Sequence, residues 1–344
     1  MSLLKENDMT TTGPVLVIVE DDADAAAPIQ RAADYAHAMK APLMLLSCIY
    51  DSYLAGVRFE DAASLQELRH ARMRKEFDRL EGLAGTFRDA GGQVETRVVW
   101  DKPRHEAIVR QVKAVKAELL VMRAHHHNLL ERSLFGNPDW QLLRVAPCPM
   151  LLVKREAYGK TPRIWAAVDP LHQNDKPAEL DERLFQWGRR LEDDLDGDLH
   201  VVHAGEDAEL LASLTSGASM AVPQRVDELQ EMLDRAHRDR LEQFRKQHDI
   251  DADKVHLLKG PASKVLLSVA DEHAVDVMVL GVVSRSIIER AVVGNTAERV
   301  LEKLPCDLLV VKPGDFEPQV EERAEIEMIC STRKGKYEAF TISG

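Results

Sequence analysis

The chain has 344 residues, of which 45% are hydrophobic and 30% charged, and these proportions are ordinary for a globular protein of two or three domains. Its net charge of −13 argues against a nucleic-acid partner, because binding to a phosphate backbone needs a basic surface. The first residues contain no apolar segment of the signal-peptide type, and the longest apolar runs are of strand length. We therefore expect a cytoplasmic protein without membrane contact.

Strand-length apolar runs alternate with helical patterns along the chain. The runs are residues 15–19, 43–49, 93–100, 119–122 and 150–153 in the first half, and residues 164–168, 199–203, 254–258, 275–280 and 308–311 in the second. Because they are nearly continuous stretches of Val, Leu and Ile, they are typical of strands buried on both faces of a parallel sheet. Apolar residues at helical spacing lie between the second and third runs of each half. The pattern predicts two α/β sandwiches, each with a five-stranded parallel sheet.

The two halves are copies of one folding unit. Residues 102–154 align with residues 260–312 without a gap, which brings Gly136 onto Gly294. A repeat of this length is a whole domain rather than a solenoid module. The predicted organisation is an N-terminal extension at 1–13, domains at 14–156 and 162–315, and a C-terminal tail, expected to be a helix with a loose end, at 316–344.

The segment after the fourth strand of the second half carries the most specific chemistry. Ligands of open α/β sheets bind at the carboxyl ends of the strands, and here Gly281 ends the strand while Gly294 precedes Asn295 and Thr296. A glycine at a strand end permits close approach of a phosphate, and a helix N-terminus offers free N–H groups and a positive dipole end. The segment therefore forms either a phosphate cradle or a plain loop in which Thr296 caps the helix.

Further motifs make both halves resemble universal stress protein domains, and the whole chain a tandem member of the E type. They are the acidic ends of the first strands, VLVIVE at 15–20 and IWAAVD at 164–169, the closing runs PCPMLLVK and PCDLLVVK, and the DWQLLR segment at 139–144. The resemblance implies a cytoplasmic, non-enzymatic protein that contributes to survival under stress. It also implies that the halves pair through their last strands, residues 150–153 and 308–311, and it leaves a homo-oligomer open.

The nucleotide motif of this family is kept in part in the second half. Its ATP-binding members carry G-x2-G-x9-G-(S/T); here Ser284 stands in place of the second glycine, and Asn295, with Thr296 adjacent, follows the last one. The resemblance implies that the second domain binds ATP or another adenine nucleotide through Asp169, Val202, Leu280, Gly281, Val283, Ser284, Gly294, Asn295 and Thr296. In the first half Arg123 and His126 replace both leading glycines and Glu20 replaces the aspartate, so we expect that half to have lost the site.

Consecutive histidines at His125, His126 and His127 are the most conspicuous polar run. They form either part of a zinc site, with His105 at the start of a following helix as a neighbour, or a solvated loop, and no CxxC or HxxxH spacing supports the zinc. His203 ends the second strand of the second half with no evident nucleophile beside it, so we interpret it as a ligand-contacting or structural residue and assign no catalytic residue.

Two other functions remain open at the level of the sequence. The chain could be an interaction module that binds no nucleotide, or that holds an apolar small molecule beside the loop at 204–224. It could also be a slow ATP hydrolase, although no residue pattern places a catalytic base or a water as phosphoryl-transfer enzymes require.

Overall fold

The computed structural model describes residues 13–20, 25–54, 62–124, 138–171, 178–205, 223–282, 300, 303–314, 316–323, 325–331 and 337–343. The chain divides into two compact units. The first consists of Met1–Met122 and Gln319–Gly344, and the second of Arg123–Pro318. The predicted domain limits at 14–156 and 162–315 stay a prediction.

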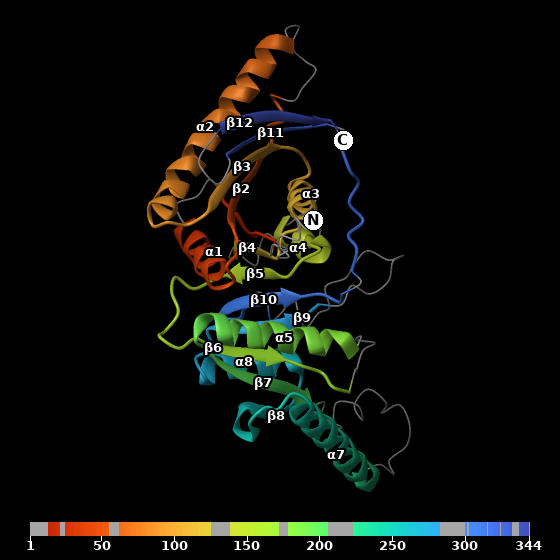
Figure 1. The fold of residues 1–344 in the computed structure, drawn as a ribbon. Helices are drawn as coiled ribbons and strands as arrows, with labels where there is room; N and C mark the ends of the chain where they lie inside the picture. The colour runs from red at the N-terminus through yellow and green to blue at the C-terminus, as the bar shows by residue number, and fades with distance from the viewer. Residues whose placement is uncertain are drawn as a thin grey trace, which may run out of the picture. The chain divides into compact units, whose positions relative to one another are not determined.

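The first unit is a twisted sheet with helices on both faces (Figure 1). Its strands lie in the order β12-β11-β3-β2-β1-β4, of which the last four are parallel. The elements that begin the chain are β1 (Val15–Ile18), α1 (Ala26–Ala38), β2 (Leu43–Ile49), α2 (Ala62–Asp89), β3 (Val94–Trp100), α3 (Arg104–Val115) and β4 (Leu119–Arg123). β1 is buried along its whole length and β4 in all but its last residue, which confirms the strands predicted there from continuous apolar runs.

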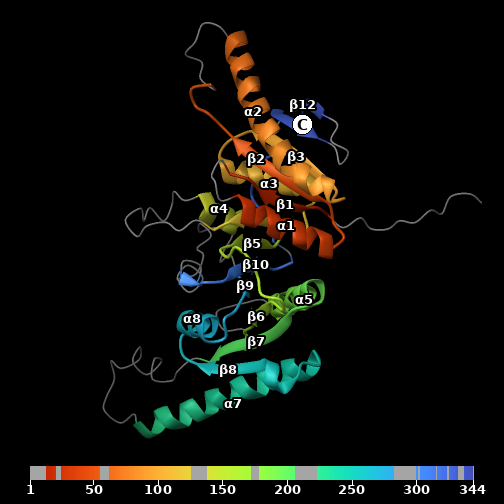
Figure 2. The same ribbon diagram turned by 90° about the vertical axis from the view of Figure 1, so that its left-hand side faces the viewer.

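The second unit has the same kind of architecture. Figure 2 shows α5 and α8 on opposite sides of the strands that run in the order β5-β10-β9-β6-β7-β8. Its strands are β5 (Met150–Val153), β6 (Arg163–Ala167), β7 (Asp198–Gly205), β8 (Val255–Lys259), β9 (Val277–Gly281) and β10 (Asp307–Val311). Its helices are α4 (Pro138–Val145), α5 (Ala178–Leu195), α7 (Pro223–Gln247), α8 (Ala262–Glu272) and the short η2 (Ala252–Lys254). The predicted α/β fold class is thus confirmed.

The last strands of the two sequence repeats, β5 and β10, pair with each other inside the second unit. They run antiparallel, with Leu309 opposite Leu151, and this confirms the predicted pairing of the two halves. β10 also pairs in parallel with β9, where Leu309 lies opposite Val279. Pairing on both sides removes the exposed apolar edge that either strand would otherwise present.

A buried carboxylate fixes the chain that leaves β5. Asp307 is 0% exposed, and its Oδ1 accepts hydrogen bonds from the backbone N–H of Lys154 at 2.8 Å and of Arg155 at 2.9 Å. Its Oδ2 accepts a third from the hydroxyl of Tyr158 at 2.7 Å. A buried carboxylate needs several such donors to offset its loss of hydration. Asp307 therefore ties the segment after the first repeat to the start of β10.

The lysines that follow β5 and β10 make equivalent contacts. Lys154 Nζ donates to the carbonyl of Leu304 at 2.9 Å, and Lys312 Nζ donates to the carbonyl of Ala146 at 2.8 Å. Lys312 also lies over the ring of Phe316, 3.9 Å from its centroid, and is 5% exposed. Burial lowers the pKa of Lys312 from 10.5 to about 7.

We expect this lysine to make stability rise with pH. Below about pH 7 Lys312 is protonated in both states, whereas between pH 7 and 10.5 the unfolded chain holds a proton that the folded chain has released. The free energy of unfolding should then increase by up to about 1.4 kcal/mol per pH unit in that interval. Chemical denaturation across it should show a steeper rise for the unmodified chain than for Lys312→Met, and equal slopes would contradict the assignment.

The C-terminal residues correct a prediction. A helix with a loose end was expected over 316–344, but the structure has two antiparallel strands there, β11 (Glu325–Ser331) and β12 (Tyr337–Ser343). β11 adds to the sheet of the first unit by pairing antiparallel with β3, so that Met328 lies opposite Val99. The physical reason is that EIEMICS and YEAFTIS contain β-branched and aromatic residues and alternate apolar with polar residues, except at Met328-Ile329-Cys330 and at Ala339-Phe340, which suits a strand. The parallel sheet of this unit therefore ends in an antiparallel hairpin.

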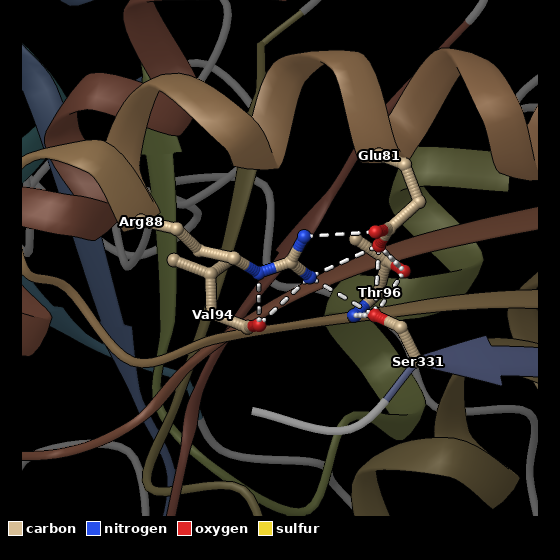
Figure 3. A network of polar contacts seen from close by, with 5 residues as sticks. All are labelled: Glu81, Arg88, Val94, Thr96 and Ser331. Carbon is tan, nitrogen blue, oxygen red and sulfur yellow. Dashed lines mark hydrogen bonds and ion pairs between the residues drawn. The ribbon is translucent and has the colours of Figure 1, made fainter. Parts of the chain in front are cut away.

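A polar network fastens β11 to β3 and α2 (Figure 3). Glu81 Oε1 accepts hydrogen bonds from the hydroxyls of Thr96 at 2.5 Å and Ser331 at 2.7 Å. Arg88 forms an ion pair with Glu81 at 2.8 Å and also donates to the carbonyl of Val94 and to the hydroxyl of Ser331. Burial would raise the pKa of Glu81, but the hydrogen bonds from Arg88, Thr96 and Ser331 outweigh it and hold that pKa below its usual value.

Candidate functional site

The strand order of the second unit reverses at β6, which lies between β7 and β9. In open α/β sheets such a reversal leaves a crevice at the carboxyl ends of the strands where ligands bind. Asp169 follows β6 there and is half-buried, while Gly281 is the last residue of the neighbouring β9. The structure thus places the predicted acidic residue and the first predicted glycine on adjacent strand ends.

Two of the predicted apolar residues lie in the sheet beneath these ends. Val202 of β7 is 1% exposed, and its carbonyl accepts the backbone N–H of Val168 at 3.0 Å. Leu280 of β9 is 8% exposed. The remaining predicted residues lie outside the described part of the chain, and they are Val283, Ser284, Gly294, Asn295 and Thr296. Their assignment stays a prediction.

Helix α5 packs tightly against the end of β9. A Cβ added at Gly281 would lie 2.9 Å from Cδ2 of Leu180 and 3.3 Å from Cδ1 of Leu184. A larger residue here would force the side chain of Leu180 to shift, so packing alone favours glycine at this position. This packing role was not evident from the sequence, since α5 lies about a hundred residues earlier in the chain than Gly281.

The peptide bond that leads into Asp169 is held by side chains on both sides. Its N–H, on Asp169, donates to Oδ1 of Asp181 at 2.9 Å, and its carbonyl, on Val168, lies 3.0 Å from Nδ1 of His203. His203 Nε2 in turn lies 2.6 Å from Nδ1 of His237 on α7. Asp181, His203 and His237 are each at most 2% exposed. Sequence reasoning missed Asp181, for which the only signal was an acidic residue in the first turn of a helix.

The tautomers of the two histidines follow from their partners. The carbonyl of Val168 can only accept a hydrogen bond, so Nδ1 of His203 carries the proton. Nε2 of a neutral His203 is then an acceptor, and Nδ1 of His237 must donate to it. Both ring nitrogens of His203 are thus used inside the protein. Of the two roles predicted for His203, the structure supports the structural one.

The corresponding strand ends of the first unit carry a different set of contacts. Glu20, which follows β1, forms an ion pair with Arg104 of α3. Arg123, the last residue of β4 and the residue predicted to replace a motif glycine, lies 3.1 Å from Glu156 through Nη1. A guanidinium in an ion pair occupies space that a glycine would leave open to a phosphate. The expectation that the first repeat lacks the site stays a prediction.

The histidine run at His125, His126 and His127 lies outside the described residues, so its role stays a prediction. His105, in the first turn of α3, is described, and burial lowers its pKa. Among the residues that the structure describes, no group of three or more His, Cys, Asp or Glu side chains could hold a metal ion.

In the same part of the chain, no helix combines the length and the apolar character needed to cross a membrane.

Two α/β sandwiches in one chain, each with an acidic residue after its first strand at a reversal of strand order, define a tandem α/β protein. The model of the universal stress protein family matches residues 11–154 and again residues 163–312. The chain therefore belongs to the universal stress protein family, as a tandem member that resembles the E type.

Curated relatives and solved structures agree with this assignment. Universal stress protein E of Photorhabdus laumondii is 29% identical over 241 residues, which are 69% of this chain and 75% of that protein. The protein of the same name in Escherichia coli K12 is 29% identical over 245 residues, 68% of this chain and 73% of its own. A structure of a putative universal stress protein from Pseudomonas aeruginosa is 26% identical and covers 90% of this chain and 96% of its own, with a TM-score of 0.65. A universal stress protein of Archaeoglobus fulgidus, 15% identical with a TM-score of 0.59 over 87% of this chain and 98% of its own, shares the fold.

Proposed function

We propose that the chain is a cytoplasmic stress-response protein whose second domain, residues 162–315, binds ATP or another adenine nucleotide. The observation that carries the proposal is the place of Asp169, which follows β6 where the strand order reverses and whose preceding peptide bond is held by Asp181 and His203. A carboxylate fixed at this crevice suits the nucleoside end of a nucleotide, since it can accept hydrogen bonds from amino and hydroxyl groups.

The phosphate end is assigned to the segment after β9. Gly281 leaves the end of that strand without a side chain, and Val283, Ser284, Gly294, Asn295 and Thr296 complete the proposed cradle. Backbone N–H groups at a helix N-terminus suit a phosphate because the helix dipole favours negative charge there. Val202 and Leu280 supply the apolar surface beneath the base. Because the chain has a net charge of −13, its overall electrostatic potential does not attract phosphates, and local backbone N–H groups are needed to bind them.

The proposed activity is binding rather than catalysis. Hydrolysis of a phosphate ester needs a group that orients water or accepts its proton near the γ-phosphate. His203 lies near the end of β7, beside the strand ends described above, and its two ring nitrogens are engaged by Val168 and His237. Turnover of ATP by the purified chain, abolished by a change at Asp169, would refute this part of the proposal.

Titration calorimetry with ATP tests the proposal directly. Asp169→Ala should weaken ATP binding by about tenfold or more, because it removes a charge-assisted hydrogen bond to the nucleoside. The matched control is Glu20→Ala, at the equivalent position after β1, where the glutamate is paired with Arg104. That change should leave the affinity for ATP unaltered. Equal losses for both variants, or a loss for Glu20→Ala alone, would place the nucleotide elsewhere.

The alternative, an interaction module that binds no nucleotide, is favoured by one contact. Leu180 and Leu184 of α5 account for the glycine at position 281 without any phosphate. In that case the chain would bind ATP no better than other anions. Mass spectrometry of the small molecules that copurify with the chain separates the two functions, because a bound adenine nucleotide would appear in the released fraction.

A further inference from the structure

The geometry points to Asp181 and His203 as positioning residues of the second domain. We propose that they clamp the peptide bond between Val168 and Asp169 from both sides and thereby aim the carboxylate of Asp169 at the nucleoside. This inference rests on the proposed nucleotide site, but the clamp itself is a property of the protein that can be measured without ligand.

The clamp uses both polar groups of one peptide unit. Asp181 accepts from its N–H at 2.9 Å and His203 donates to its carbonyl at 3.0 Å, so rotation of that peptide about its flanking bonds would break one or both hydrogen bonds. The peptide lies just beyond the last residue of β6, where the ladder between β6 and β7 ends with Ala167 opposite Val202. A carboxyl group beyond the end of a strand is free to turn unless its backbone is held in this way.

Each member of the clamp is itself held. Asp181 is 2% exposed and lies in the first turn of α5, where the positive end of the helix dipole stabilises its negative charge. His203, also 2% exposed, is held in place by the hydrogen bond between its Nε2 and Nδ1 of His237 on α7. The orientation of Asp169 therefore depends on residues from α5, α7 and β7.

Among the described residues of the first repeat, no equivalent clamp is seen. Ile18 lies opposite Leu46 as Ala167 lies opposite Val202, so the residue that corresponds to His203 is Ser47. The hydroxyl of Ser47 donates to Oε1 of Glu76 at 2.6 Å, and a hydroxyl has only one proton to donate. The first turn of α1 contains no acidic residue that could act as Asp181 does. The described residues of the two repeats thus differ at this place independently of the glycine motif.

The test compares two substitutions at one position in the full-length chain. Asp181→Ala removes the acceptor, whereas Asp181→Asn keeps an oxygen that can accept the N–H of Asp169. We expect hydrogen exchange at the Asp169 amide to accelerate by about tenfold or more in the alanine variant, and to stay within about threefold of the unmodified chain in the asparagine variant. The dissociation constant for ATP should follow the same order, with the loss in the alanine variant and recovery in the asparagine variant.

A second variant covers the case in which Asp181→Ala does not fold. His203→Ser places the residue of the first repeat in the second, and we expect it to accelerate exchange at Asp169 and to weaken ATP binding by about tenfold. Unchanged exchange at Asp169 in His203→Ser or Asp181→Ala would overturn the clamp. Faster exchange with an unchanged affinity for ATP would show that the clamp does not position the nucleotide ligand, and would overturn the inference as well.

The same experiment keeps the two proposals apart. If the unmodified chain binds no ATP, the proposed function fails, and with it the role of the clamp toward nucleotide. Exchange at the Asp169 amide in the three variants then still decides whether Asp181 and His203 hold this peptide bond.

Discussion

Leu309→Pro should unfold the pairing of β5 with β10 and bring the chain close to global instability. Leu309 is 1% exposed and lies in the middle of β10, opposite Leu151 on one side and Val279 on the other. Proline removes the backbone N–H and clashes within a central strand, and the substitution also removes a buried leucine side chain. The combined cost is about 5 kcal/mol or more, which is comparable to the whole stability of a typical domain.

Light scattering and hydrogen exchange at Met150–Val153 measure this effect. The proline variant should expose apolar strand edges and aggregate, and any soluble fraction should lose protection in β5. Leu309→Ile is the matched control, because it keeps the volume and the backbone N–H and should cost less than about 1.5 kcal/mol. A proline variant that stays soluble, with β5 as protected as in the unmodified chain, would show that the pairing adds little to stability.

The strands of the two repeats could be predicted because their signal is local. Runs such as Val15–Ile18 and Leu308–Val311 are continuous and apolar, and only a strand covered on both faces buries every residue of so short a run. The pairing of the last strands was predictable for a related reason, since two short apolar strands that end their repeats would otherwise be exposed edges.

The C-terminal hairpin and the clamp on Asp169 could not be predicted in the same way. The alternation in Glu325–Ser331 permits a strand, but its partner β3 lies more than two hundred residues away, and no local pattern specifies that pairing. The contacts of Asp181 and His203 depend on the packing of α5 and on where the β6–β7 ladder ends. The spacing of residues in the sequence indicates neither the packing of α5 nor the end of the ladder. The sequence therefore shows that an aspartate and a histidine are present at these positions, but not what they contact.

Removal of the C-terminal hairpin should destabilise the first unit more than any single substitution outside its core. A chain that ends at residue 318 lacks β11, whose Glu327–Ser331 segment pairs with β3 along five residues and whose Met328 and Ile329 are each 5% exposed. It also lacks Ser331, and with it two hydrogen bonds, one that Ser331 donates to Glu81 and one that it accepts from Arg88. Loss of this burial and of these bonds should cost about 5 kcal/mol or more.

Removal of the hairpin also leaves a buried charge with fewer partners. Asp101, at the end of β3, has a side chain 1% exposed that forms ion pairs with Arg110 at 2.7 Å and with Arg323 at 2.7 Å. Arg110 in turn donates to the carbonyl of Glu321 at 3.0 Å. The truncated chain keeps Asp101 and Arg110 but loses Arg323 and Glu321. Removing partners from a buried charge is strongly destabilising, because the charge stays out of water without full compensation. We therefore expect the truncation to destabilise β3 first.

Hydrogen exchange resolved by segment separates the local effect from a general one. In the chain that ends at residue 318, amides of β2 and β3 should exchange much faster than in the full-length chain, while those of β7 and β9 should be unaffected. A chain that ends at residue 336 keeps β11 and the Glu81 network and loses only β12, so it should retain most of the protection in β3. Two truncated chains with equal protection in β3 would mean that β11 does not stabilise this edge. The hairpin would then lie against the sheet of the first unit without contributing to the stability of that sheet.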